Sequence, residues 1–98
     1  MSAVKPTADP LARFIDHLWV EYGLGAHSQA AYRGDLERLA AFLARRGSTL
    51  DAASEADLFD FLGQADGLAA RTKARRLSSM RRYYQYLLRE GMRSSDPT

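Results

Sequence analysis

The sequence predicts an all-α protein, a small orthogonal bundle of four or five helices. Along four segments, apolar residues recur every three or four positions, which is the spacing of one face of an α-helix. No segment alternates apolar and polar residues as a half-buried strand does. The composition is 46% hydrophobic and 10% aromatic over 98 residues, which is enough for one small domain with a modest core.

The first helix is expected to begin at Asp9 and Pro10, after a loose leader of residues 1–9. Aspartate can cap free backbone N–H groups, and proline fits the first helical position, where its missing N–H group is not needed. Gly23 and Gly25 are expected to form the turn after this helix. The residues expected to face the core are Leu11, Phe14, Ile15, Leu18 and Tyr22.

The second helix is expected over residues 26–46, and the third from Ser54 to the Asp66-Gly67 pair. Ser54 and Asp57 have the spacing of a capping box, in which each side chain accepts a hydrogen bond from the other residue's backbone. The apolar residues expected to be buried in these two helices are Tyr32, Leu36, Leu39, Phe42, Leu43, Leu58, Phe61 and Leu62.

The fourth helix is expected over residues 69–90, with Gly91 ending it. On a helical wheel its apolar and basic residues separate onto opposite faces. The apolar face consists of Ala70, Leu77, Met80, Tyr84, Leu87 and Leu88. The opposite line consists of Arg71, Arg75, Ser78, Arg82 and Arg89, flanked by Arg76, Ser79, Tyr83 and Tyr86. We therefore expect the arginines of this line to be exposed and dispensable for folding.

Basic charge is concentrated at the C-terminal end of the chain. Residues 71–98 hold eight Lys or Arg and two acids, whereas residues 1–70 hold six Lys or Arg and ten acids. A polyanion such as nucleic acid would be attracted to the C-terminal third, because guanidinium groups pair with phosphate oxygens and with guanine edges. The alternative is an ordinary solvated helix face, but such a face usually mixes both signs of charge.

Several classes of function are excluded or disfavoured. The chain contains no cysteine, which excludes disulfides, thiol catalysis and thiolate metal sites. His17 and His27 have no partners at metal-ligand spacing, so we expect no metal and no other cofactor. No nucleophile, base and oxyanion donor come together, so no catalytic residue is predicted. The chain has no apolar run of about 20 residues and no secretory signal, so we expect a soluble, cytoplasmic protein without membrane contact.

Two smaller surfaces have two interpretations each. The start of the second helix carries His27, Ser28, Gln29 and Arg33. Its free N–H groups could hold a phosphate, or the residues could serve only ordinary capping and solvation. Trp19 lies off the core stripe of the first helix. It would either anchor a partner protein or cover the domain core, and we favour the second interpretation.

Three segments together resemble a known family. They are residues 24–36 (LGAHSQAAYRGDL) continuing to 42–43, residues 75–87 (RRLSSMRRYYQYL), and residues 89–91 followed by Asp96-Pro97. Their order and spacing resemble the N-terminal core-binding domain of Xer-type tyrosine site-specific recombinases, the SAM-like helical domain of phage-integrase relatives. The resemblance covers about residues 10–98. The positions that depart from the usual pattern are Gly25, His27 and Gly34.

The resemblance implies that the second and fourth helices lie against the major groove of duplex DNA. The DNA-contacting positions of the family fall on Ser28, Gln29, Arg33, Lys73, Arg75, Arg76, Ser79 and Arg82, and the charge pattern adds Arg71. The resemblance also implies that the catalytic Arg, Lys, His and nucleophilic Tyr belong to a separate C-terminal domain. Residues 10–93 would then form the DNA-binding domain, and residues 94–98 would begin the linker to that catalytic domain.

For the full-length protein, the resemblance implies cleavage and rejoining of DNA through a 3′-phosphotyrosine link. The expected partners are duplex DNA and the other recombinase subunits of a synaptic tetramer, in the cytoplasm at the nucleoid. Chromosome-dimer resolution and integration of a mobile element both remain open as its task. The alternative function for this chain is a helical protein–protein interaction module, with Trp19 and Val20 on its surface.

Overall fold

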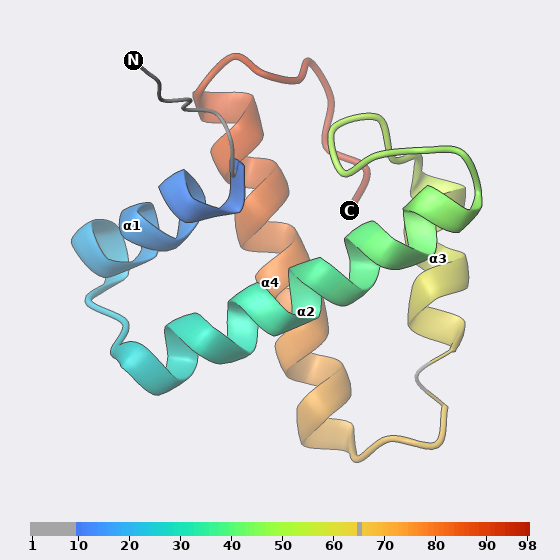
Figure 1. Ribbon diagram of the computed structural model, residues 1–98, viewed down its shortest axis with the longest axis horizontal. Helices are drawn as coiled ribbons and strands as arrows, with labels where there is room; N and C mark the ends of the chain where they lie inside the picture. The colour runs from blue at the N-terminus through green and yellow to red at the C-terminus, as the bar shows by residue number, and fades with distance from the viewer. Residues whose placement is uncertain (1–9, 65) are drawn as a thin grey trace, which may run out of the picture.

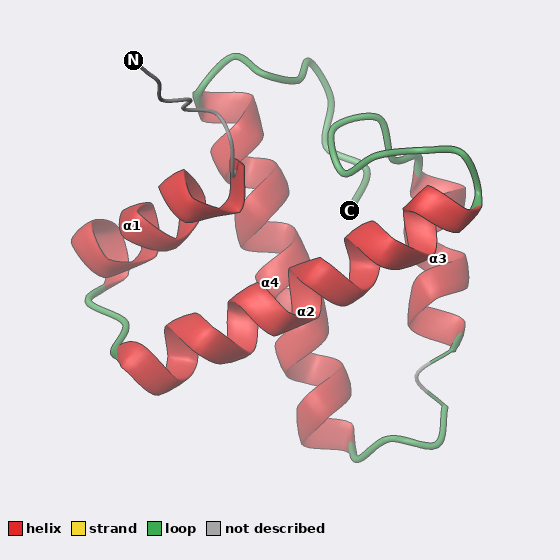
Figure 2. Ribbon diagram, viewed as in Figure 1, coloured by secondary structure: helices red, strands yellow, loops and turns green. Residues whose placement is uncertain are grey.

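The computed structural model describes residues 10–64 and 66–98. Its four α-helices are α1 (Pro10–Tyr22), α2 (Ala26–Arg45), α3 (Glu55–Gly63) and α4 (Ala70–Arg89) (Figure 1). No strand occurs in the described part of the chain, as the colouring of Figure 2 shows. The predicted all-α fold and its four helices are therefore confirmed. The expected leader and the expected cap Asp9 lie outside the described residues.

Helix α2 lies across α4, and the two form the centre of the domain (Figure 1). Helix α1 packs against α2 and brings the ring of Phe14 to 5.2 Å from Tyr83 and 5.4 Å from Tyr86 on α4. Helix α3 packs against α2, where the rings of Phe42 and Phe61 lie 5.4 Å apart. Because α2 contacts each of the other helices, its side chains decide how the domain is held together.

The core confirms most of the predicted apolar stripes. All five residues predicted for α2 are buried, and so are Leu11, Phe14 and Leu18 of α1. In α3, Leu58 and Phe61 are buried and Leu62 packs against them. Tyr22, at the end of α1, is 41% exposed, so its assignment to the core was wrong.

The buried face of α4 differs from the predicted one. Tyr83 and Tyr86 were expected beside the basic line, but they are buried, with 0% and 5% of their surface exposed. Ala70 is exposed and Leu77 is only partly buried, although both were assigned to the core. The buried face and the exposed face of α4 therefore lie at a different angle around the helix axis from the faces that the helical wheel predicts.

Hydrogen bonds explain how polar side chains can occupy the buried face of α4. The Tyr84 hydroxyl donates to the carbonyl oxygen of Leu50 at 2.7 Å. The Tyr83 hydroxyl donates to a carboxylate oxygen of Asp51 at 3.4 Å. Both tyrosines therefore bury a large ring and still satisfy the hydroxyl at its tip, which removes most of the cost of burying a polar group.

The helix ends follow local rules that were visible in the sequence. Gly47 follows α2 with a positive φ of 77°, a conformation that glycine adopts without steric cost. The predicted capping box of α3 is present: the Asp57 N–H donates to Ser54 Oγ at 3.1 Å, and the Ser54 N–H donates to Asp57 Oδ2 at 3.0 Å. The backbone hydrogen bond from Ser54 holds the pKa of Asp57 below its usual value. Helix α3 ends at Gly63, earlier than the expected Asp66-Gly67.

The segment after α4 turns back onto the domain. Arg93 donates to the Asp51 carbonyl at 3.1 Å and to the Ser95 carbonyl at 2.8 Å, and its guanidinium lies 5.2 Å from the centre of the Tyr84 ring. Pro97 is buried, in a hollow that Leu58 and other residues of α3 and α4 also line. Residues 92–98 are therefore attached to the body of the domain at two places.

The buried tyrosines predict how the domain responds to high pH. Burial raises the pKa of Tyr83 and of Tyr84 above the ordinary value near 10. A tyrosine with a raised folded-state pKa stabilises the fold below its unfolded-state pKa, and this stability is lost as the pH rises through the folded-state pKa. We therefore expect alkaline unfolding to begin above about pH 10. Tyr83 and Tyr84 should ionise at a higher pH than exposed tyrosines, or only when the domain unfolds. Absorbance of tyrosinate during a pH titration measures this ionisation.

The matched control is the double variant Tyr83→Phe, Tyr84→Phe, in which the delayed ionisation should be absent. Simultaneous titration of all five tyrosines in the folded wild-type domain would contradict the expectation.

Candidate nucleic-acid interface

A buried carboxylate lies between α2 and α4. Asp35, in the middle of α2, is only 1% exposed. Arg75 of α4 donates to it through two hydrogen bonds, from Nε to Oδ2 at 2.9 Å and from Nη2 to Oδ1 at 2.8 Å. The Ser79 hydroxyl has a single proton, which the Arg76 carbonyl at 2.9 Å and Asp35 Oδ2 at 3.2 Å share as acceptors. This two-pronged geometry is the strongest form of arginine–carboxylate pair, and it joins the two central helices.

Two further arginines lie close to the same carboxylate. Arg76 Nε and Arg38 Nη1 are each 3.6 Å from Asp35 Oδ1, at ion-pair distance but beyond a good hydrogen bond. One negative charge therefore faces three positive charges, two from α4 and one from α2. The hydrogen bond from Arg75 to Asp35 raises the pKa of Arg75, so the guanidinium stays charged.

Arg76 and Arg82 are held partly by aromatic rings. The Arg82 guanidinium lies 4.1 Å from the ring centre of Tyr22 and 5.7 Å from that of Tyr32. The Arg76 guanidinium lies 5.7 Å from the ring centre of Phe61. Cations over ring faces are stabilised by the ring quadrupole. Arg76 Nε and Arg82 Nη1 are nevertheless buried without a hydrogen-bond partner in the described part of the molecule.

The structure corrects part of the prediction that the arginine line of α4 is exposed: Arg71 and Arg89 are exposed, but Arg75 and Arg82 are not fully so. Arg75 and Arg82 are partly buried and hold α4 against its neighbours. Ser79 has no exposed surface. The helical wheel failed here because it places every charged residue in solvent, whereas Asp35 is an internal partner for Arg75 and two tyrosine rings cover Arg82.

The outermost line of α4 is different from the predicted one. The exposed residues along it, three and four positions apart, are Arg71, Ala74, Ser78, Arg81, Gln85 and Arg89. Neither Arg71 nor Arg81 forms an ion pair with any described residue. Ten residues of helix separate them, which is about 15 Å along the axis. Sequence reasoning included Arg71 in the site but missed Arg81, although its charge and its i+3 spacing from Ser78 were visible.

The remaining predicted residue of α4 has a weak surface contact. Lys73 Nζ lies 3.8 Å from a carboxylate oxygen of Asp66, whose side chain is 91% exposed. Arg89, near the end of the helix, lies 2.7 Å from His17 Nε2 and 3.7 Å from Glu21 on α1. Exposed ion pairs of this kind contribute little to stability and can exchange partners readily.

The three predicted residues of α2 lie in its first half. Ser28 is exposed, as is His27 beside it. The Gln29 side chain donates to the Leu24 carbonyl at 2.6 Å and so closes the turn before the helix. Arg33 donates to Glu37 at 3.1 Å. Gly25 caps α2 without a side-chain hydrogen bond, as the departure from the family pattern at this position predicts.

Trp19 does not cover the core, so the favoured interpretation of this residue was wrong. Its side chain is 60% exposed, and the neighbouring Val20 is 79% exposed. The stripe of Leu11, Phe14 and Leu18 faces the core, and Trp19 follows the last of these residues on the outward side. The interpretation as a contact surface for another protein therefore gains support.

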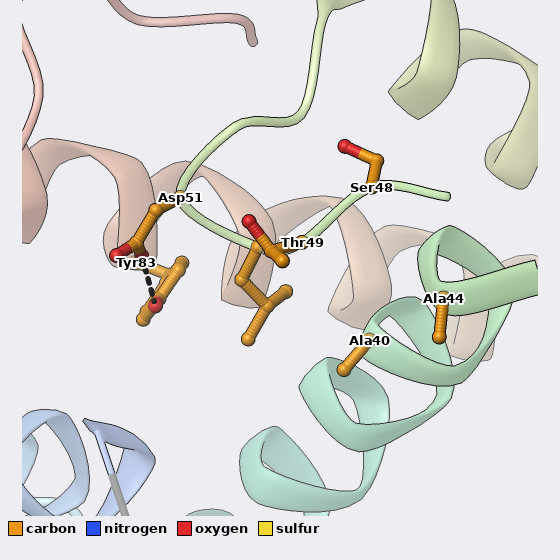
Figure 3. Close-up of a pocket in the computed structure, with 7 residues that line it drawn as sticks. Ala40, Ala44, Ser48, Thr49, Asp51 and Tyr83 are labelled. Atoms are coloured by element: carbon orange, nitrogen blue, oxygen red, sulfur yellow. Dashed lines mark hydrogen bonds between the residues drawn. The ribbon is translucent and has the colours of Figure 1, made fainter. Parts of the chain in front are cut away.

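Figure 3 shows a hollow beside the connection between α2 and α3. Ala40, Ala44, Ser48 and Thr49 line this hollow of about 300 Å³, and the Tyr83 hydroxyl points toward Asp51 within it. Burial raises the pKa of Tyr83, which keeps the hydroxyl protonated and makes it a poor nucleophile. Across the described residues no group of His, Asp or Glu could hold a metal ion, and no helix is long and apolar enough to cross a membrane.

The all-α architecture of the described residues, with the arginine-rich helix α4 at its centre, agrees with the family that sequence comparison identifies. The chain belongs to the family described as phage integrase, N-terminal SAM-like domain, which matches residues 11–91. This result confirms the resemblance found in the sequence.

Three curated relatives carry the name tyrosine recombinase XerD. The protein of Agrobacterium fabrum is 43% identical over 90 residues, which are 90% of this chain and 27% of the relative. That of Yersinia pestis is 43% identical over 98 residues, 97% of this chain and 33% of the relative. That of Pseudomonas aeruginosa is 41% identical over 88 residues, 88% of this chain and 30% of the relative. The chain thus spans about a third of the length of the relatives it matches.

The pairing of Asp35 with Arg75 predicts that Arg75 stabilises the fold. Arg75→Gln should lower the free energy of unfolding by about 2–4 kcal/mol, because it leaves a buried carboxylate without its main partner. Arg71→Gln, which removes the same charge from the exposed line, should change stability by less than about 0.5 kcal/mol. Urea denaturation followed by circular dichroism measures both values. Equal stabilities of the two variants would show that the buried pair contributes nothing.

Proposed function

We propose that this chain is the DNA-binding domain of a tyrosine site-specific recombinase, and that α2 and α4 contact duplex DNA. The observation that carries the proposal is the excess of arginine on α4. Two of these arginines, Arg71 and Arg81, have no ion-pair partner among the described residues. Membership of the phage integrase family and the names of the relatives support it. The chain would bind DNA without cutting it.

On α4, the proposed contact surface follows the exposed line rather than the predicted one. Arg71 and Arg81 would pair with phosphates at a separation of about 15 Å, and the short side chains of Ala74 and Ser78 between them let the helix approach the duplex. Arg75 adds a third guanidinium at the edge of this line. Ser79 is left out because it has no exposed surface. Arg76 and Arg82 would contribute mainly through their charge, and Lys73 could leave its exposed partner Asp66.

On α2, the proposed contact surface is the N-terminal half of the helix. Gly25 provides no side-chain cap, so the first N–H groups of α2 are free to meet a phosphate. Ser28 is exposed next to them, and Arg33 lies about one turn further along. Gln29 would need to break its bond to Leu24 before it could reach a base edge.

For the whole protein we propose the chemistry that the family resemblance implies. DNA strands would be cleaved and rejoined through a 3′-phosphotyrosine link, by residues of another domain, within a synaptic tetramer in the cytoplasm at the nucleoid. Both chromosome-dimer resolution and integration of a mobile element fit this domain. Trp19 and Val20, exposed on α1, favour a second and compatible role, contact with another protein such as a neighbouring recombinase subunit.

Salt dependence tests DNA binding directly. Fluorescence anisotropy of a labelled duplex should show binding at low salt, with an affinity that falls steeply as salt rises from about 50 to 200 mM, because bound arginines displace counterions from phosphates. Absence of binding at low ionic strength, or an affinity independent of salt, would refute the proposal.

Single arginines test the contact surface. Arg81→Ala should weaken binding and reduce the slope of log affinity against log salt by about one, since one phosphate contact is lost. The matched control is Arg13→Ala, which removes the same charge from an exposed position on α1 and should leave the slope nearly unchanged. Equal effects of the two variants would mean that the outer line of α4 does not touch DNA.

A further inference from the structure

Asp35 is an unexpected residue beside a surface that would bind DNA. Its negative charge lies within hydrogen-bond distance of Arg75 and 3.6 Å from Arg38 and Arg76. By charge alone it should repel phosphates. Because the carboxylate is buried, it must be held by strong partners, and it accepts two hydrogen bonds from Arg75, with the Ser79 hydroxyl 3.2 Å from Oδ2.

The pair with Asp35 uses only part of the Arg75 guanidinium. The group carries five N–H donors, and Nε and Nη2 each give one of them to Asp35. Nη1 has no hydrogen-bond partner among the described residues, and it is not among their buried unsatisfied atoms. Because 35% of the side chain is exposed, Nη1 keeps some accessible surface.

We propose that Asp35 is a positioning residue, which fixes the guanidinium plane of Arg75 so that its Nη1 edge meets a phosphate of duplex DNA. This inference rests on the proposed function. Two parallel hydrogen bonds leave the guanidinium one orientation, and the carboxylate that accepts them is itself buried, with 1% of its surface exposed.

Fixing the side chain favours binding because a flexible arginine loses rotamer freedom when it binds a phosphate. Arg75 has already lost that freedom in the free protein, so binding need not order it again. The exposed Arg71 and Arg81 lack such a support among the described residues. Arg75 would therefore bind through a fixed geometry, whereas Arg71 and Arg81 would act mainly through their charge.

The variant Asp35→Asn separates positioning from charge because the two predict opposite signs. Removing a negative charge near the surface should tighten DNA binding if only electrostatics matters. Loss of the two-pronged support of Arg75 should instead weaken DNA binding. We expect the affinity for the same duplex, measured by anisotropy at constant salt, to fall by about fivefold or more.

The matched control is Glu37→Gln. Glu37 also lies on α2 and also accepts a hydrogen bond from an arginine Nε, that of Arg33, but its side chain is 57% exposed. This variant removes the same charge, and we expect unchanged or tighter binding. A result for Asp35→Asn that matches Glu37→Gln would overturn the positioning role, while binding by the wild-type domain would leave the proposed function intact.

A double-variant cycle tests whether Asp35 acts through Arg75. If it does, Asp35→Asn should weaken binding in the wild-type background but have no weakening effect in the Arg75→Gln background. Equal weakening in both backgrounds would overturn the inference. The double variant also removes both charges of the pair, so it does not leave a buried charge without a partner.

A second variant keeps the test decisive if Asp35→Asn does not fold. Arg75→Lys retains the charge but cannot form the two-pronged bond. Circular dichroism at the binding temperature first checks that this variant is folded. Positioning predicts a loss of about fivefold or more in affinity with an unchanged salt slope. Unchanged affinity would overturn the inference. Failure of the wild-type domain to bind any duplex would refute the proposed function itself, and it is a separate outcome.

Discussion

The domain depends on one buried ion pair, between Asp35 of α2 and Arg75 of α4. The two helices cross at the centre of the molecule, where the pair opposes rotation or sliding of α4 against α2. A carboxylate that is 1% exposed and bonded in two places resists such movement, since any shift leaves a buried charge unpaired. The buried position of Ser79 and the rotation of Tyr83 and Tyr86 into the core follow from the same orientation of α4.

Much of the fold could be predicted because its signals are local. The stripe from Tyr32 to Leu43 on α2 and the capping box of Ser54 each lie within one segment, and both are present in the structure. The pair of Asp35 and Arg75 could not be predicted, because the two residues are 40 positions apart and nothing in either segment indicates the other. A helical wheel assigns each charged residue to solvent, so it overlooked a charge that has an internal partner.

Prediction of the candidate interface from sequence was limited in the same way, because contacts between distant segments were not visible. Charge composition located the basic helix correctly, because counting arginines does not require knowledge of their contacts. Choosing among the arginines does require it. Arg75 and Arg82 are partly enclosed, whereas Arg81 is exposed and was overlooked. Covering of the core by Trp19 was the favoured interpretation, but Leu11, Phe14 and Leu18 are the buried residues of α1, and Trp19 is 60% exposed.

The segment after α4 has a consequence for any longer polypeptide that contains this domain. Arg93 binds the connection between α2 and α3, and Pro97 is buried in a hollow lined by residues of α3 and α4. A continuing chain would therefore depart from beside α3 and not from the tip of α4. The point from which such a chain departs would thus be fixed against the body of the domain by Arg93 and Pro97.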